Sequence, residues 1–266
     1  NDRGRNFSIN SSASSLVNYI IKTYSKPQHN SVLNNRKDYF DFCKSIDTNI
    51  ISFSSTKKTK VASHFLTDQV KIWSWEEICN ELSNISNNKD ATDIFLKTID
   101  APLRLEFLTA IALKQQLPSL KVEPGYSVDD YGTPTSFAGA GHPDIICKEG
   151  NNEIIIELTT IRSAQQIASE MVPIHHHLLD LINKGSQNKD YGLIFIAPII
   201  HERSYTYGKF MHFEEDLCIA NIKIEDFKNE LSQKNNLKEL LDSYQVKSKH
   251  SIADIKKIIN TNKNIN

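Results

Sequence analysis

The clearest pattern of apolar and polar positions in this chain lies between residues 144 and 159. Residues 145–148 and 153–159 are rich in isoleucine and have the composition of β-strands. Between them, Gly150-Asn151-Asn152 has the residue types of a tight turn. The pattern therefore predicts a β-hairpin.

Side chains alternate between the two faces of a strand, so the second strand presents Ile155, Glu157 and Thr159 on one face and apolar residues on the other. A carboxylate in the middle of an apolar strand needs a partner, a cation or a raised pKa, because an unpaired buried charge is costly. Asp144 precedes the neighbouring strand. A divalent cation shared by Asp144 and Glu157 is the simplest solution.

Other segments have helical or buried-strand patterns. Gly192 to Pro198 is an apolar run typical of a central strand. Ser74 and Glu77 form a capping-box pattern, and Asp100 before Pro102 is typical of a helix start. The predicted helices are Ser14 to Tyr24, Arg36 to Ile46, Trp75 to Leu82, Ala91 to Ile99, Leu103 to Leu113, Ser163 to Asn183, Ile224 to Tyr244 and Ser251 to Ile259.

Strand, strand, helix and strand in this order predict an α/β fold, with a mixed sheet flanked by helices. We expect this fold in residues 99–266, preceded by a smaller, mainly helical module in residues 1–98. Residues 123–141 contain glycines and prolines that disfavour regular structure, and a loop this long beside the hairpin is more often functional than idle.

Composition adds limits on the class of protein. The 266 residues contain four scattered cysteines, which we interpret as reduced thiols, and they contain neither a signal peptide nor an apolar run that could span a membrane. We therefore expect a cytoplasmic protein. The first residue is Asn1 rather than methionine, which suggests a fragment or a processed product.

The formal net charge of −1 conceals an uneven distribution along the chain. Residues 1–60 carry ten Lys/Arg against four Asp/Glu, and residues 221–266 carry nine against six, so the span between them carries −10. Carboxylates that hold a metal, flanked by basic segments that contact phosphates, would give this distribution. Solvated surface lysines would give it equally well.

Three further side chains are candidates for chemistry. Glu106 has apolar neighbours along its helix, so it is either buried against Arg104 or another cation, or lines a site. Glu170 and His177 are two helical turns apart on one side of their helix, together with Gln166. Gln165 and Gln166 would contact DNA or cap the helix, and we interpret His175 and His176 as surface residues.

The arrangement of acids in this chain resembles that of the PD-(D/E)XK nucleases. One acid lies at a strand start, a second lies in the next strand, and a third lies on an upstream helix. Pro143-Asp144 and Glu157-Leu158-Thr159 fit that motif, with Thr159 where lysine is usual. Four segments resemble one branch of these nucleases in particular. They are Asp100 to Leu108, Asp129-Asp130-Tyr131-Gly132, Ile156 to Thr159 and Gln165 to His177. That branch is the cleavage domain of type IIS restriction endonucleases of the AlwI kind and the related nicking endonucleases, and the resemblance covers roughly residues 99–245.

The resemblance implies a Mg²⁺-dependent endonuclease that hydrolyses phosphodiester bonds of double-stranded DNA, with Mn²⁺ able to substitute. Asp144 and Glu157 would bind the metal, and Glu106 would reach a metal directly or through water. Glu170 would hold a second metal or its water, and His177 would act as general base or orient the attacking water. One strand would be cut per active site, so a double-strand break would need a homodimer or a second cleavage subunit.

The resemblance also places a recognition domain upstream in the native chain. Two alternatives remain open. One is a PD-(D/E)XK nuclease of another defence or repair system, and the other is a catalytically idle scaffold that binds DNA.

Overall fold

The computed structural model describes residues 61–129, 131–139, 141–186 and 188–256. The predicted helices at Ser14 to Tyr24 and Arg36 to Ile46 lie outside the described residues. One compact unit comprises residues 62–127 and 134–266, and a second comprises residues 1–61 and 128–133.

The centre of the first unit is a five-stranded mixed sheet in the order β1-β4-β5-β6-β7. The strands β1 and β5 are both antiparallel to β4, whereas β5, β6 and β7 are parallel to one another. The α/β fold with a mixed sheet is therefore confirmed. The strand bounds are β1 (Lys121–Pro124), β4 (Ile145–Glu149), β5 (Asn152–Leu158), β6 (Asp190–Ala197) and β7 (Ile219–Lys223), and β2 (Ser127–Val128) pairs separately with β3 (Pro134–Ser136).

The predicted hairpin is formed by β4 and β5, with Ile145 opposite Ile156. Gly150 in the turn has a φ of 56°, a conformation that costs glycine little and other residues more. The next strand, β6, lies in the middle of the parallel half of the sheet, and its last six residues are all buried. This explains the uninterrupted apolar run from Gly192 to Ala197, which was predicted as a central strand.

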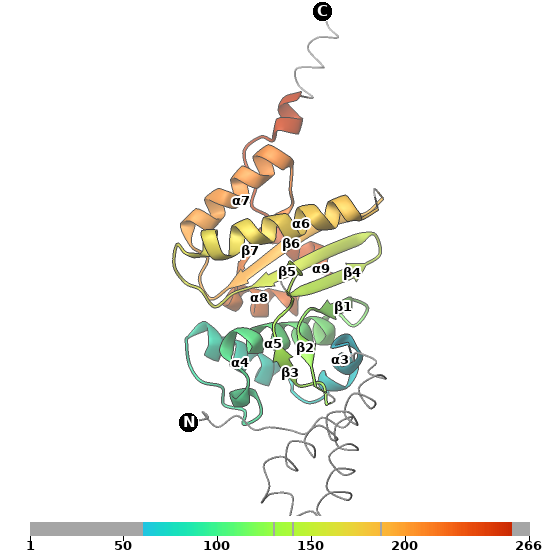
Figure 1. Cartoon of the computed structure of the whole chain (residues 1–266), viewed down its shortest axis with the longest axis vertical. Helices are drawn as coiled ribbons and strands as arrows, with labels where there is room; N and C mark the ends of the chain where they lie inside the picture. Colours follow the sequence, from blue (N-terminus) through green and yellow to red (C-terminus); the bar gives the residue numbers. More distant parts are fainter. Residues whose placement is uncertain (1–60, 130, 140, 187, 257–266) are drawn as a thin grey trace, which may run out of the picture. The chain divides into compact units, whose positions relative to one another are not determined.

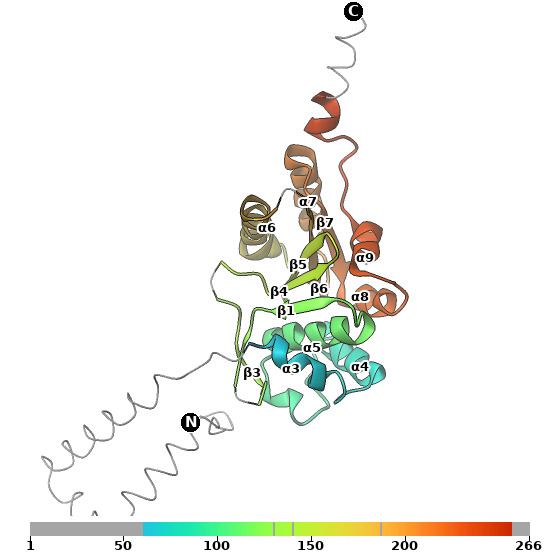
Figure 2. The same ribbon diagram turned by 90° about the vertical axis from the view of Figure 1, so that its right-hand side faces the viewer.

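Helices cover both faces of the sheet (Figures 1 and 2). Helices α6 (Val172–Lys184) and α7 (Glu202–Glu215) lie on one face, and α8 (Ile224–Leu231) and α9 (Leu237–Tyr244) lie on the other. Ile155, Phe195 and Leu178 belong to the buried cluster beneath α6 and α7. The face of β5 that carries Glu157 is therefore the face that α6 covers.

Helix α5 (Ala101–Gln116) contacts β1 and β5, and α3 (Ser63–Gln69) and α4 (Trp75–Ser86) pack against it. Residues 103–113 of α5 are all buried, as expected for a helix surrounded by protein. The predicted capping box of α4 is confirmed, since Ser74 accepts from the backbone of Glu77 and the Glu77 side chain accepts from the backbone of Ser74.

Predicted helix limits were wrong where side chains bind the backbone. Between residues 91 and 99 only a 3₁₀ turn, Leu96–Thr98, forms, because buried Glu81 accepts hydrogen bonds from the backbone N–H groups of Thr92 and Asp93 at 2.8 and 2.9 Å. The helix predicted from Ile224 to Tyr244 is broken into α8 and α9, because the Asn236 side chain caps a new helix start. Asp100 precedes α5, but its side chain makes no capping hydrogen bond.

Two other predicted helices are shorter than expected. The helix predicted from Ser163 begins as a π-helical segment, Ile167–Met171, and continues as α6. Residues 252–256 are helical, and the rest of the predicted C-terminal helix lies outside the described residues.

Cys79, Cys147 and Cys218 are free thiols. Among the described residues, no helix is long and apolar enough to cross a membrane.

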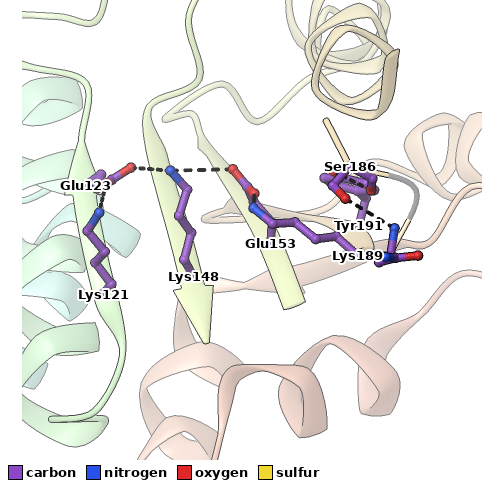
Figure 3. A network of polar contacts seen from close by, with 8 residues as sticks. Lys121, Glu123, Lys148, Glu153, Ser186, Lys189 and Tyr191 are labelled. Carbon is purple, nitrogen blue, oxygen red and sulfur yellow. Dashed lines mark hydrogen bonds and ion pairs between the residues drawn. The ribbon is translucent and has the colours of Figure 1, made fainter. Parts of the chain in front are cut away.

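A chain of charges crosses β1, β4 and β5 (Figure 3). Lys148 contacts Glu123 at 2.8 Å and Glu153 at 3.5 Å, and Lys189 contacts the other oxygen of Glu153. Because the Glu153 side chain is only 9% exposed, this network is partly shielded from solvent.

We expect Glu153→Ala to lower the free energy of unfolding by about 1–3 kcal/mol, because it leaves two half-buried lysines without their shared carboxylate. Chemical denaturation of the full chain measures this. Asp180→Ala removes an exposed ion pair with Lys184 and should change stability by less than about 0.5 kcal/mol. Equal effects of the two substitutions would contradict the argument.

Candidate active site

A cavity of about 470 Å³ opens where β5 ends. All five candidate residues line it, although they come from four elements and the segment before β4. They are Glu106, Asp144, Glu157, Glu170 and His177. No lysine or arginine lines this cavity among the residues that the structure describes.

Asp144 is held immediately before β4 by contacts on both sides. Its carbonyl oxygen accepts a hydrogen bond from the Gly125 N–H at 2.7 Å, and its Oδ2 accepts from the Leu158 N–H at 2.8 Å. A Cβ on Gly125 would lie 2.5 Å from the Pro143 carbonyl oxygen, so glycine is required for this close approach. The Asp144 carboxylate is thereby fixed beside the end of β5.

Glu157 lies in β5 and is only 5% exposed. Its Oε1 is 2.8 Å from Nδ1 of His177 on α6. An ionised carboxylate can only accept, so Nδ1 must donate the hydrogen bond, and Nε2 of a neutral His177 is then free to accept a proton. The prediction that Glu157 and Thr159 share a face is confirmed by this contact and by the hydrogen bond of Thr159 to Glu170 at 3.0 Å.

Glu106 points from α5 into the cavity and is 4% exposed. Arg104 is not its partner, because Nη1 of Arg104 donates to the carbonyls of Leu96 and Ile99 instead. Oε2 of Glu106 has no hydrogen-bond partner in the described part of the chain. Burial, followed by repulsion from Glu157, raises the pKa of Glu106 to about 8.

The other acids are also held in unfavourable surroundings. Burial raises the pKa of Asp144 well above its usual value, and repulsion from Glu157 and Glu106 adds to this. Burial also raises the pKa of Glu157, although the hydrogen bond from His177 opposes the shift. Burial raises the pKa of Glu170 despite its hydrogen bond from Thr159. The cavity therefore gathers acids whose ionisation the protein itself disfavours.

The π-helical segment explains how Glu170 reaches this cavity. Proline at position 173 has no N–H and would clash with the carbonyl four residues earlier, so a regular α-helix cannot continue through it. The wider turn, Ile167–Met171, precedes Pro173, and Glu170 within it meets Thr159 of the β5 end. Thr159 thus positions the carboxylate of Glu170 beside the end of β5.

Two neighbouring residues differ from expectation. Gln166 is fully buried, with Nε2 donating to the carbonyls of Ile161 and Ile199 and Oε1 accepting from Ser204, so it braces the protein interior and does not face DNA. His175 was predicted at the surface but is only 8% exposed, because its Nε2 lies 3.0 Å from Glu215 of α7. His176 is exposed, as predicted.

The acids suit a hard divalent cation in the chemistry of their donors. They offer carboxylate oxygens, which Mg²⁺ prefers, and the partnerless Oε2 of Glu106 is a buried oxygen without a role in the fold. Within the described residues, no group of three His, Cys, Asp or Glu side chains is arranged so that it could hold a metal ion by itself. Water and substrate oxygens would complete the coordination, as is usual for Mg²⁺.

Sequence reasoning missed the residues that shape the cavity around the acids. Outside this lining, Tyr126 is 3% exposed, its hydroxyl has no hydrogen-bond partner among the described residues, and burial together with the charge of Glu106 raises its pKa. The rim includes Phe137 and His142 from the loop before β4, and Pro102 from α5. The long loop signalled Phe137, and the helix start signalled Pro102, but neither pattern indicated that these residues line the site.

Comparisons with known proteins agree with this geometry. Residues 9–229 match the model of a family described as AlwI restriction endonuclease. The match begins well before residue 99, so it includes the N-terminal segment that the resemblance above leaves out. No curated protein matches the chain.

One similar solved structure is the small subunit (R.BspD6I2) of the heterodimeric restriction endonuclease R.BspD6I. It matches with a TM-score of 0.52 and 22% sequence identity, over 63% of this chain and 87% of that chain. At this identity the likeness shows the fold, which is that of a restriction endonuclease subunit.

Proposed function

This chain belongs to the AlwI restriction endonuclease family, and on that basis we propose that its acidic cavity hydrolyses phosphodiester bonds of double-stranded DNA in a Mg²⁺-dependent reaction. The family supports a nuclease that acts at specific sites. The observation that carries the proposal is the meeting of buried Glu106 and Glu157 with partly buried Asp144 in a cavity that no described lysine or arginine lines.

Asp144 and Glu157 would hold the metal, with Glu106 and Glu170 as further ligands directly or through water. Bound Mg²⁺ neutralises charge on the phosphate and lowers the pKa of coordinated water, and Mn²⁺ can supply the same chemistry. Among the described residues, His142 and His177 are the basic side chains that line the cavity, so neither a lysine nor an arginine offsets the charge of the acids.

His177 is suited to take the proton of the attacking water. Glu157 accepts from Nδ1 and so fixes the ring orientation, leaving Nε2 to receive the proton. The water oxygen then bonds to phosphorus while the bond from phosphorus to the 3′ oxygen breaks. The products are a 5′-phosphate and a 3′-hydroxyl.

The chain offers one such cavity in its described part, so we assign to it the cleavage of one DNA strand per encounter. A double-strand break would then need a homodimer or a second cleavage subunit. The structural neighbour is itself a subunit of a heterodimeric restriction endonuclease. Type IIS cleavage or nicking, with sequence recognition by a further domain upstream, fits this arrangement.

The test is incubation of supercoiled plasmid with the full chain in Mg²⁺, in Mn²⁺ and in EDTA. We expect nicked circles as the first product with either metal and none in EDTA. Product formed equally well in EDTA would overturn metal dependence. Intact plasmid in both metals, with and without a specific partner subunit, would support the idle DNA-binding scaffold instead.

His177→Gln tests the role of the histidine. We expect the single-turnover cleavage rate to fall by about 10²-fold or more, the usual contribution of a general base, because glutamine cannot accept the proton of water. Mg²⁺ affinity, measured by calorimetry, should change less than threefold. A large loss of Mg²⁺ affinity with an unchanged rate at saturating metal would show that His177 only positions Glu157.

A further inference from the structure

A second cavity, of about 300 Å³, lies at the start of α5. Its lining is predominantly basic, in contrast to the acidic cavity. The charged residues that line it are Lys89, Asp90, Lys97, Asp100, Arg104 and Arg162. With four cations and two acids, the lining carries a formal charge of +2.

The two cavities are neighbours on opposite flanks of one helix. Pro102 and Glu106 are four residues apart on α5 and line the acidic cavity, whereas Ala101 and Arg104 are three residues apart and line the basic one. Successive residues of an α-helix are about 100° apart, so Glu106 and Arg104 leave α5 in nearly opposite directions. Thr160, just beyond β5, lines both cavities.

Glu81, Asp90 and Asp100 attract Arg104, but not at ion-pair distance. Within the described residues, none of the four cations has an acidic partner within ion-pair distance. Arg104 is 5% exposed, and its Nε has no hydrogen-bond partner in the same residues. A buried guanidinium nitrogen without an acceptor normally indicates a missing partner.

Helix α5 adds its own polarity to the same place. Its sixteen residues begin at Ala101, and the side chain of Asp100 does not cap the first turn. The first N–H groups of the helix therefore lack a side-chain acceptor, and the helix dipole favours an anion there. The basic side chains and the helix start thus point to one class of ligand.

We propose that this cavity, which we call the basic pocket, binds a phosphodiester group of the DNA substrate next to the group that is cut. The inference rests on the proposed function of the acidic cavity. The planar guanidinium of Arg104 would donate hydrogen bonds, and Lys89 and Lys97 would add positive charge. This combination suits the two non-bridging oxygens of a phosphodiester. Holding the adjacent phosphate would place the scissile one over the acids of the first cavity.

Lys89 and Lys97 are exposed, so both can be replaced without disturbing the core, whereas Arg104 also binds the carbonyls of Leu96 and Ile99. The test compares Lys89→Gln/Lys97→Gln with Lys71→Gln/Lys184→Gln, a control with the same loss of charge. Lys71 and Lys184 are exposed and outside both cavities.

The full chain is titrated with a fluorescent duplex in EDTA over a range of salt concentrations. Losing one phosphate contact lowers the steepness of the plot of log affinity against log salt concentration by about 0.9. At about 0.1 M salt, the same loss lowers the affinity by about five- to tenfold. We expect this of the basic-pocket variant and less than twofold from the control. Equal losses in the two variants, or no loss in either, would overturn the proposal.

A second measurement separates this proposal from the proposed function. Inorganic phosphate, added to ¹⁵N-labelled protein in EDTA, should shift the Arg104 Nε–H resonance in a saturable manner, and the shift should be at least fivefold weaker in Lys89→Gln/Lys97→Gln. An unchanged resonance would exclude the basic pocket even if the protein cleaves DNA. Conversely, a saturable shift in a protein that never cleaves DNA would retain the pocket and reject the nuclease.

Discussion

Supercoiled plasmid should remain intact with Asp144→Asn and with Glu157→Gln under conditions in which the unaltered chain converts it fully. Both substitutions keep the shape of the side chain and remove its charge, at the two positions that meet at the β4 and β5 ends. Loss of a metal-binding carboxylate removes several kcal/mol of stabilisation from the transition state. We therefore expect the cleavage rate to fall by about 10³-fold or more.

Glu214→Gln is the matched control, because Glu214 is exposed on α7 and lies outside both cavities. It should cleave at the unaltered rate. Thermal unfolding in EDTA must show that the Asp144 and Glu157 variants are folded, which we expect because each loses a destabilising charge. A rate within tenfold of the unaltered chain for either variant would remove that residue from the catalytic assignment.

Glu106→Gln should make the metal-free protein more stable at pH 8. The pKa of Glu106 rises from 4.5 to about 8 on folding, so between these values the folded protein holds a proton that the unfolded chain has released. The free energy of unfolding therefore decreases as the pH rises from 4.5 to 8, by about 4 kcal/mol for this one group. Glutamine cannot ionise and removes that decrease.

Thermal unfolding in EDTA at pH 5 and pH 8 measures the effect. We expect Glu106→Gln to raise the Tm by about 10 °C at pH 8 and by little at pH 5, while Glu214→Gln changes neither. Mg²⁺ should stabilise the unaltered chain more than the Glu106 variant, because the ion relieves the same repulsion. A variant that is less stable than the unaltered chain at pH 8 would show that Glu106 is ionised and paired in the fold.

Local periodicity was sufficient to predict the part of the site that lies on one hairpin. Glu157 could be placed beside Asp144 because two adjacent strands and a short turn allow one pairing in which the apolar residues share a face. Likewise, the apolar neighbours of Glu106 correctly indicated a buried position. These inferences need only the geometry of single elements.

Contacts between distant segments could not be read in the same way. His175 is buried because Glu215 of α7, 40 residues later, lies against it. Gln166 is buried because residues 199–204 supply hydrogen-bond partners for its side chain. The helix predicted at residues 91–99 does not form because Glu81 binds the backbone N–H groups of Thr92 and Asp93. The basic pocket depends on packing of this kind and has no motif in the sequence.

The dispersal of the acids has a consequence for how the protein is made. The β4–β5 hairpin joins neighbouring segments and can form early during synthesis. Glu106 is synthesised before the hairpin. Glu170 and His177 are synthesised after it, in the π-helical segment Ile167–Met171 and in α6. Until the later helix docks, the emerging polypeptide has Glu106, Asp144 and Glu157 without the histidine that binds Glu157. Under the proposed function, we therefore expect a nascent chain that ends before α6 to be inactive as a nuclease.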